Sequence, residues 1–168
     1  TLTNGPTWTT GKIGGASNFD GVDDYVNVLD SSSISLTGNY TFSAWIKTTN
    51  ITNSHSILDK RDTGDNNGYG MLINSASIEG LIQVLTQPGS STPISVYSNT
   101  AIGVNIWYHV VGVYDGSNII VYINAVNNGS TVSASNPTDG IGNLKIGVHY
   151  GGVAQPFSGL IDEVRIYN

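Results

Sequence analysis

Aspartates are the residues of this sequence best suited to chemistry, because Asp both closes turns and binds hard cations such as calcium. Ten of the twelve acidic residues are Asp. Asp20 and Asp162 stand near opposite ends of the chain, and the first and last strands of a β-sandwich usually run side by side. Two carboxylates would then meet at one sheet edge. Calcium takes about six to eight oxygens, and the Gly38-Asn39 turn could supply others. We therefore expect a calcium site formed by Asp20, Gly38, Asn39 and Asp162.

Each of these carboxylates also has a purely structural interpretation. Asp20 precedes Gly21 and could cap a turn, whereas Asp162 could pair with Arg165 or Lys12. A closed site of carboxylates and carbonyls leaves no coordination position open toward a substrate. The expected calcium is therefore structural and would fasten the ends of the chain.

Glutamates are too few to suggest glycoside hydrolysis, which needs two carboxylates about 5 to 9 Å apart. Glu79 lies in a Ser-Ile-Glu-Gly turn and Glu163 follows the proposed ligand Asp162, so we do not expect them to face each other. The sequence has no G-x-S-x-G motif, and His109 lies within a predicted strand, where a packed core histidine is the simpler interpretation. We therefore expect a protein that binds rather than an enzyme.

Aromatic residues favour carbohydrate as a ligand, because sugars stack their C–H faces on aromatic rings and hydrogen-bond to a few planar polar groups. The chain has nine Tyr and three Trp. Those in the predicted strands, Trp45 and Trp107 among them, are expected in the core. The predicted ligand-binding residues are Arg61, Tyr69, Tyr97, His149, Tyr150 and Gln155, with Trp8 as a further candidate. Each of them could equally be an ordinary loop side chain.

Short strands must position these residues, since period-two patterns recur between clusters of Gly, Asn, Ser and Asp and no stretch shows a helical period over three turns. Phe42, Ala44 and Ile46 share one face of the clearest strand, and the Asp115-Gly116-Ser117-Asn118 turn predicts a hairpin. The predicted strands are 25–29, 40–47, 57–60, 69–73, 81–85, 94–97, 106–114, 119–123, 144–148 and 160–167. This pattern indicates an antiparallel sandwich or barrel.

Length and charge narrow the class of protein further. With 168 residues and 39% hydrophobic residues, the chain fits one domain spanning 1–168. A net charge of -6 with only six basic residues argues against a nucleic-acid partner. The sequence shows neither an apolar run of membrane-spanning length nor a signal peptide. Because it begins at Thr1, we expect a module cut from a longer protein.

Four segments, read in order, resemble the laminin-G-like domains of the concanavalin-A-like superfamily. They are GASNFDGVDDYV (15–26), YTFSAWIK (40–47), WYHVVGVYDG (107–116) and FSGLIDEVRIYN (157–168). The resemblance implies an all-β, two-sheet antiparallel jelly-roll sandwich and a structural calcium bound through Asp162. It also implies a secreted or cell-surface bacterial protein, since such domains occur in surface proteins and polysaccharide-degrading enzymes. One departure is Asn124-Ala125, where the family usually has Asp-Gly; it should alter a turn and not the fold.

Two functions are consistent with the sequence. The first is a non-catalytic carbohydrate-binding module, monomeric within a multidomain protein, with a polysaccharide or glycan as its partner and no membrane insertion. The second is a structural or adhesion domain that contacts proteins or the cell surface without binding sugar. Two or more of Tyr69, Tyr97, Tyr150 and Trp8 lining one face would favour the first.

Overall fold

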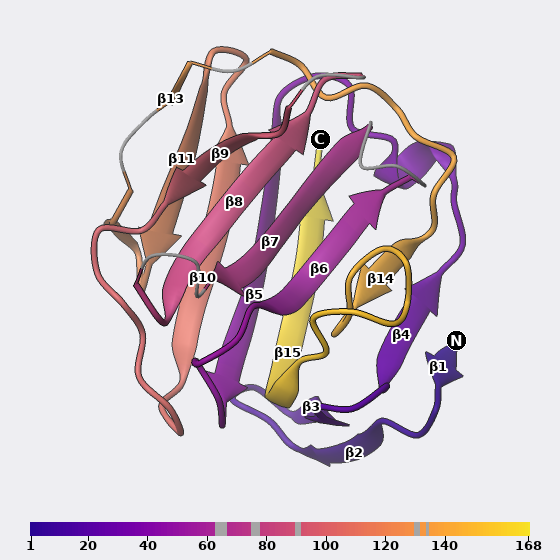
Figure 1. Ribbon diagram of the computed structural model, residues 1–168, viewed down its shortest axis with the longest axis vertical. Helices are drawn as coiled ribbons and strands as arrows, with labels where there is room; N and C mark the ends of the chain where they lie inside the picture. The colour runs from indigo at the N-terminus through magenta and orange to yellow at the C-terminus, as the bar shows by residue number, and fades with distance from the viewer. Residues whose placement is uncertain (63–66, 75–77, 90–91, 130–131, 134) are drawn as a thin grey trace.

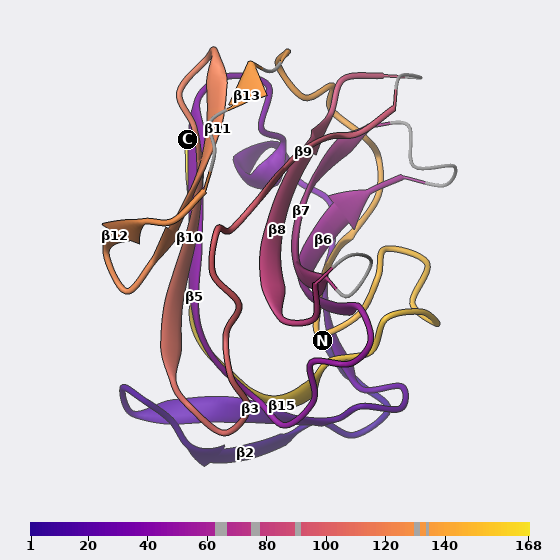
Figure 2. The same cartoon turned by 60° about the vertical axis from the view of Figure 1, so that its left-hand side comes forward.

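Two antiparallel β-sheets lie face to face in the computed structural model, which describes residues 1–62, 67–74, 78–89, 92–129, 132–133 and 135–168 (Figures 1 and 2). Sheet A, in front in Figure 1, has the strand order β1-β4-β14-β6-β7-β8-β9. Sheet B, behind it, has the order β12-β11-β10-β5-β15-β3-β2, with β13 paired to β11. The predicted two-sheet jelly roll is therefore confirmed.

The ten predicted strands are present, together with short strands at the sheet edges and one unpredicted internal strand, β3, between β15 and β2 of sheet B. Sheet A consists of β1 Leu2–Thr3, β4 Tyr25–Val28, β14 Leu144–Ile146, β6 His55–Arg61, β7 Gly68–Asn74, β8 Leu81–Gln87 and β9 Ile94–Tyr97. Sheet B consists of β12 Val126–Asn127, β11 Asn118–Ile123, β10 Tyr108–Tyr114, β5 Tyr40–Thr48, β15 Ser158–Tyr167, β3 Gly15–Asp20, β2 Thr7–Thr10 and β13 Val132–Ser133. A 3-10 helix, η1, covers Ser32–Ile34. Within the described ranges, no helix is long and apolar enough to cross a membrane.

The side chains of β5 point alternately to the inner and outer faces of sheet B, which shows how the sequence forms the sandwich. Phe42, Ala44 and Ile46 are fully buried between the sheets, so the side chains between them turn to the outer face of sheet B. Trp45 lies on this outer face opposite His109 of β10, and both are partly exposed. The expectation that these two residues belong to the core was wrong, because their position in the alternation points them away from it.

Aromatic rings fill the space between the sheets at one end of the core. Tyr40 lies 5.3 Å from Phe42, 5.8 Å from Tyr69 and 5.4 Å from Tyr114 between ring centroids. Rings at this spacing gain favourable edge and stacking contacts beyond simple burial. Gly112 makes room for this packing: a Cβ there would lie 2.5 Å from the Phe42 ring and 2.9 Å from Val84 of the opposite sheet.

The two ends of the chain are joined by backbone hydrogen bonding. β3 and β15 pair antiparallel, with Phe19 opposite Gly159 and Asp20 opposite Ser158. β15 also pairs with β5 on its other side, which makes the C-terminal strand an internal strand of sheet B. The strand that ends at Asp20 therefore runs beside the C-terminal strand, but β1 and β4, the first strand of the chain and the first predicted strand, pair with each other in sheet A. The expectation that the first and last strands run side by side was wrong in this respect.

Two tight turns on the β10–β12 side of sheet B follow from their sequences. Asp115 Oδ1 accepts hydrogen bonds from the backbone N–H groups of Ser117 (2.8 Å) and Asn118 (2.7 Å), which confirms the predicted hairpin between β10 and β11. Asn124 and Ala125, between β11 and β12, have φ of 51° and 66°. A positive φ is costly for Ala, so the departure from Asp-Gly leaves a strained turn and an unchanged fold.

Candidate functional site

A polar pocket lies on the outer face of sheet A, and we call it the sheet A pocket. Its volume is about 320 Å³, within the usual range for small-ligand sites. Its floor comes from β7, β8 and β9, where the register places Leu72 opposite Gln83 and Leu85 opposite Ser95. The lining residues are Arg61, Leu72, Asn74, Gln83, Leu85, Pro93, Ser95, His149 and Gln155.

A buried ion pair forms one wall of the sheet A pocket. Arg61 donates from Nε to Asp59 Oδ1 at 2.9 Å and from Nη2 to Asp59 Oδ2 at 2.6 Å. Both residues lie on β6 two positions apart, so their side chains share the outer face. Asp59 is 1% exposed and Arg61 is 7% exposed. Burial raises the pKa of the Asp59 carboxyl, while the hydrogen bonds and charge of Arg61 oppose that rise.

The loop between β14 and β15 covers the same side of sheet A (Figure 1). The guanidinium of Arg61 lies 5.1 Å from the centroid of the Tyr150 ring, within cation–π distance. The His149 and Tyr150 rings are 4.0 Å apart. Gln155 is fixed from β6, because its carbonyl accepts the Ser56 N–H at 2.9 Å and its side-chain Oε1 accepts the Ser56 hydroxyl at 3.2 Å. The loop therefore holds the rings of His149 and Tyr150 and the carboxamide of Gln155 over β6.

Four of the six predicted ligand-binding residues meet at this pocket. Arg61, His149 and Gln155 line it, and Tyr150 contacts Arg61. Tyr97 is 42% exposed and lies opposite the lining residue Gln83, so it faces the same side of sheet A. Tyr97 and Tyr150 thus lie on the same outer face as the sheet A pocket, and neither is among the residues that line it.

Two predicted aromatics lie elsewhere. Tyr69 was expected at a loop surface, but it is 1% exposed and its hydroxyl donates to the Ile34 carbonyl at 2.9 Å. It alternates with the core residues Met71 and Ile73 on β7, so it cannot contact a ligand and that prediction was wrong. Trp8 is 71% exposed on β2 of sheet B, away from the sheet A pocket.

The predicted metal ligands are not brought together, because the strand register keeps them apart. Asp20 lies opposite Ser158, four residues along β15 from Asp162, a separation of about 13 Å. The Asp162 carboxylate instead accepts the Ile13 N–H at 2.8 Å. Gly38 and Asn39 precede the end of β5 that pairs with Tyr167, at the opposite end of the strand from Asp20. The four-residue site proposed from sequence was therefore wrong.

Asp20 has acidic neighbours within its own turn. One carboxylate oxygen from each of Asp20, Asp23 and Asp24 lies within 4.8 Å of the others. Asp24 is 5% exposed, and its Oδ2 accepts the Asp20 N–H at 3.0 Å. Asp20 also borders a separate hollow with Asn50, Asn53 and Ser158. The signal for this group was the D-G-x-D-D spacing of residues 20–24, which sequence reasoning used for Asp20 alone.

Chemically, the sheet A pocket offers hydrogen-bond donors and acceptors together with the imidazole ring of His149, and the Tyr150 ring packs on Arg61 beside it. Carboxamides come from Asn74, Gln83 and Gln155, and a guanidinium comes from Arg61. Asp59 and the two carboxamides on β7 and β8 were missed by sequence reasoning. The signal for Asp59 was its two-residue spacing to Arg61, which directly follows the predicted strand 57–60 and is the last residue of β6.

Comparison with known proteins gives one family and a set of similar folds. A family model described as the concanavalin A-like lectin/glucanases superfamily matches residues 20–168. No curated protein sequence matches the chain. Domain 4 of AbnA, an extracellular GH43 arabinanase from Geobacillus stearothermophilus solved with arabinotriose, has a TM-score of 0.73 and 24% identity over 98% of this chain and 76% of that one.

Two further structures have similar folds at lower identity. The carbohydrate-binding module CBM66 from Bacillus subtilis has a TM-score of 0.58 and 18% identity over 100% of this chain and 94% of that one. Domains LG4-5 of the mouse laminin α1 chain have a TM-score of 0.69 and 13% identity over 96% of this chain and 41% of that one. At these identities the likeness shows the fold alone.

Proposed function

The chain belongs to the concanavalin A-like lectin/glucanases superfamily, as its sequence resemblance predicted, and from this premise we propose that it is a non-catalytic carbohydrate-binding module. Its ligand is a polysaccharide or glycan, bound in the sheet A pocket. We propose that the module works as a monomer within a larger secreted or cell-surface protein.

The observation that carries this proposal is the fixed polar and aromatic arrangement around Arg61. Asp59 holds the guanidinium in one orientation through two hydrogen bonds, and the Tyr150 ring lies against it. Sugar hydroxyls suit planar donors and acceptors such as guanidinium and carboxamide, while sugar C–H faces suit an aromatic ring. Because these groups are held by strands and by an anchored loop, little ordering is required when ligand binds.

Known relatives in fold support the same function. Domain 4 of AbnA was solved in complex with arabinotriose, and CBM66 is described as a carbohydrate-binding module. Both share the two-sheet architecture over nearly the whole of this chain.

The arrangement of carboxylates supports a non-catalytic role. Glu79 lies in the turn before β8 of sheet A, and Glu163 lies in β15 of sheet B, so the two glutamates do not form the facing pair that glycoside hydrolysis requires. In the sheet A pocket, both oxygens of Asp59 are engaged by Arg61. A screen for released reducing sugar tests this part of the proposal, and steady release from any polysaccharide would overturn it.

A glycan array of plant, algal and host glycans is the experiment that tests the binding proposal. We expect retention of at least one class of neutral oligosaccharide by the purified module. Silence across all three groups of glycan would overturn the proposal and favour a structural or adhesion role instead.

We further propose a structural calcium bound by Asp20, Asp23 and Asp24. The donor set fits calcium, because it consists of oxygen ligands that converge from one turn and calcium prefers several carboxylate and carbonyl oxygens. A bound ion would neutralise three neighbouring negative charges and fasten the turn between β3 and β4.

A melting experiment tests the calcium site. After chelation, added calcium should raise the melting temperature of the wild-type protein. Asp23→Asn should reduce that rise, whereas Glu79→Gln, an exposed acid in another turn, should keep it. An unchanged melting temperature in chelator and in calcium would contradict the site.

A further inference from the structure

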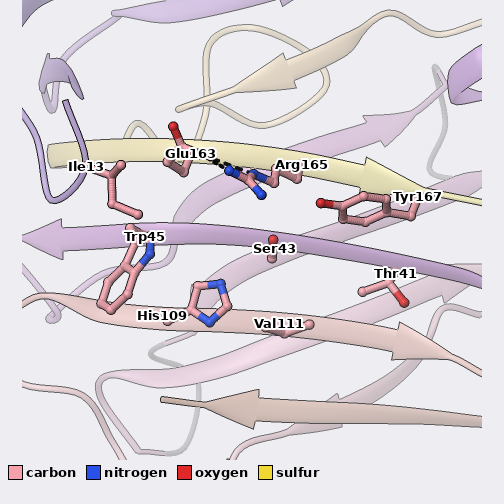
Figure 3. A pocket seen from close by; sticks show the side chains of 9 residues that line it. All are labelled: Ile13, Thr41, Ser43, Trp45, His109, Val111, Glu163, Arg165 and Tyr167. Atoms are coloured by element: carbon pink, nitrogen blue, oxygen red, sulfur yellow. Dashed lines mark hydrogen bonds and ion pairs between the residues drawn. The ribbon is translucent and has the colours of Figure 1, made fainter. Parts of the chain in front are cut away.

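A second pocket lies on the outer face of sheet B, the opposite side of the sandwich from the sheet A pocket (Figures 2 and 3). We call it the sheet B pocket. Its volume is about 330 Å³, close to that of the sheet A pocket. Figure 3 shows its side chains on three neighbouring strands, β10, β5 and β15, with Ile13 added from the turn between β2 and β3.

An aromatic pair forms one end of the sheet B pocket. Trp45 and His109 face each other across β5 and β10, with ring centroids 5.1 Å apart at an angle of 37°. Lys12 places its ammonium 5.1 Å from the Trp45 ring. The hairpin that carries Lys12 is fixed by the hydrogen bond from Ile13 N–H to Asp162. A large ring is therefore held in place on a face that the opposite sheet does not cover.

A strained turn of the backbone adds charged groups to this pocket. The pairing between β15 and β5 shifts between Asp162 and Arg165, which marks a β-bulge. Glu163, within the bulge, has φ of 50°, a conformation that costs free energy for a non-glycine residue and is concentrated at functional positions. The bulge brings Glu163 onto the outer face, where Arg165 Nε donates to it at 3.1 Å.

Tyr167 supplies a second aromatic surface at the far end. It is 52% exposed and lies opposite Thr41, four residues along β5 from Trp45. The two aromatic side chains are thus separated by about 13 Å along the strand, with the Glu163–Arg165 pair between them (Figure 3). This length exceeds a single sugar ring and suits a short oligosaccharide laid along β15.

We propose that the sheet B pocket is a second glycan-binding site, specific for neutral oligosaccharides. The ion pair presents a planar donor and acceptor to sugar hydroxyls, and the charges of Glu163 and Arg165 cancel. The Lys12 ammonium at the Trp45 end is engaged by the indole ring. Trp45 and Tyr167 stack against the sugar faces. With sites on both outer faces, one module bridges two polysaccharide chains and gains avidity on a polymer. This proposal rests on the proposed function for the class of ligand, but on different residues.

NMR titration of the isotopically labelled protein tests the second site. The probes are arabinotriose, xylotriose, cellotriose and mannotriose, each added to about 10 mM so that even a millimolar Kd gives near saturation. We expect one sugar to shift the Trp45 indole N–H signal in the wild type and in Tyr150→Ala, and Tyr167→Ala to weaken that shift at least fivefold. Tyr167 is exposed, so its replacement should leave the fold intact.

The outcomes separate the two proposals. If the Trp45 signal moves with no sugar, or if Tyr150→Ala abolishes its shift, the second site is overturned. If the side-chain amide of Gln83 never moves while Trp45 does, the sheet A pocket fails and the sheet B pocket stands. A Trp45 signal that moves only when a protein partner is added would also overturn the second glycan site, in favour of a docking face.

Discussion

Replacing Arg61 by Gln removes the partner of a carboxylate that is almost completely buried. Asp59 is 1% exposed and receives two hydrogen bonds from Arg61, so solvent offers it no replacement. Breaking a buried pair by removing one partner costs about 3 to 5 kcal/mol. For a domain of this size, each kcal/mol lowers the melting temperature by about 2 to 4 °C. We therefore expect Arg61→Gln to melt roughly 6 to 20 °C below the wild type.

The double variant Asp59→Asn with Arg61→Gln tests whether the unpaired Asp59 carboxylate causes the loss of stability. It carries no charge at either position of the pair, so it should recover more than half of the lost free energy of unfolding in a urea titration. Arg165→Gln is the matched control, since its pair with Glu163 is exposed and should contribute little. If Arg61→Gln melts within a few degrees of the wild type, or if the double variant is no more stable than the single one, the reasoning fails.

The pH dependence of Arg61→Gln supplies a second check on the same pair. Burial already raises the pKa of Asp59, and Arg61 is the main opposing influence. Without Arg61, the pKa of the Asp59 carboxyl in the folded state rises further above its value in the unfolded state. The protonated form then stabilises the folded state at low pH, and this contribution is lost as the pH rises through the folded pKa. The stability gap to the wild type should therefore narrow as the pH is lowered from neutral.

Other positions give independent tests of the fold. Ala125→Gly should raise the free energy of unfolding by about 0.5 to 1 kcal/mol, because Ala125 has a positive φ that glycine adopts without strain; a loss of stability in urea would contradict this. Gly112→Ala should cost about 1 to 3 kcal/mol by crowding Phe42 and Val84, and wild-type stability would show that the sheets are packed less tightly. Burial, and to a smaller extent the charge of Arg165, lowers the pKa of His109. The neutral imidazole therefore contributes to stability above the unfolded-state pKa of about 6.5, and this contribution is lost as the pH falls below that value. His109→Gln should flatten the decline in melting temperature below that pH, and an equal decline in both proteins would refute the assignment.

The fold could be predicted because alternation and turn chemistry act locally. The Asp115 turn and the β5 pattern each required only a few neighbouring residues. The same alternation, applied more strictly, would have placed Tyr69 in the core, since Met71 and Ile73 follow at two-residue spacing on β7. It would also have turned Trp45 outward, because Phe42, Ala44 and Ile46 occupy the inner face.

The position of Asp20 relative to Asp162 could not be predicted because it depends on strand register. The segment that ends at Asp20 pairs with the C-terminal strand, but the sequence does not specify which residue lies opposite Asp20. A four-residue offset separates Asp20 from Asp162 and leaves Asp20 beside Asp23 and Asp24. Part of the sheet A pocket could be predicted because residue type, and not strand register, indicated it. Arg61, His149, Tyr150 and Gln155 are side chains suited to sugar binding, and the fold brings them together.

Calorimetric titration of the best array ligand into wild type and Tyr150→Ala is the most direct test of glycan binding in the sheet A pocket. Tyr150 packs on the lining residue Arg61. Truncation of an aromatic hot-spot residue commonly costs about 2 kcal/mol or more of binding free energy, so we predict roughly a 30-fold weaker Kd. Trp8→Ala, which removes an exposed aromatic from β2 outside this pocket, should bind like the wild type. Equal affinity of Tyr150→Ala and the wild type for that ligand would contradict the account.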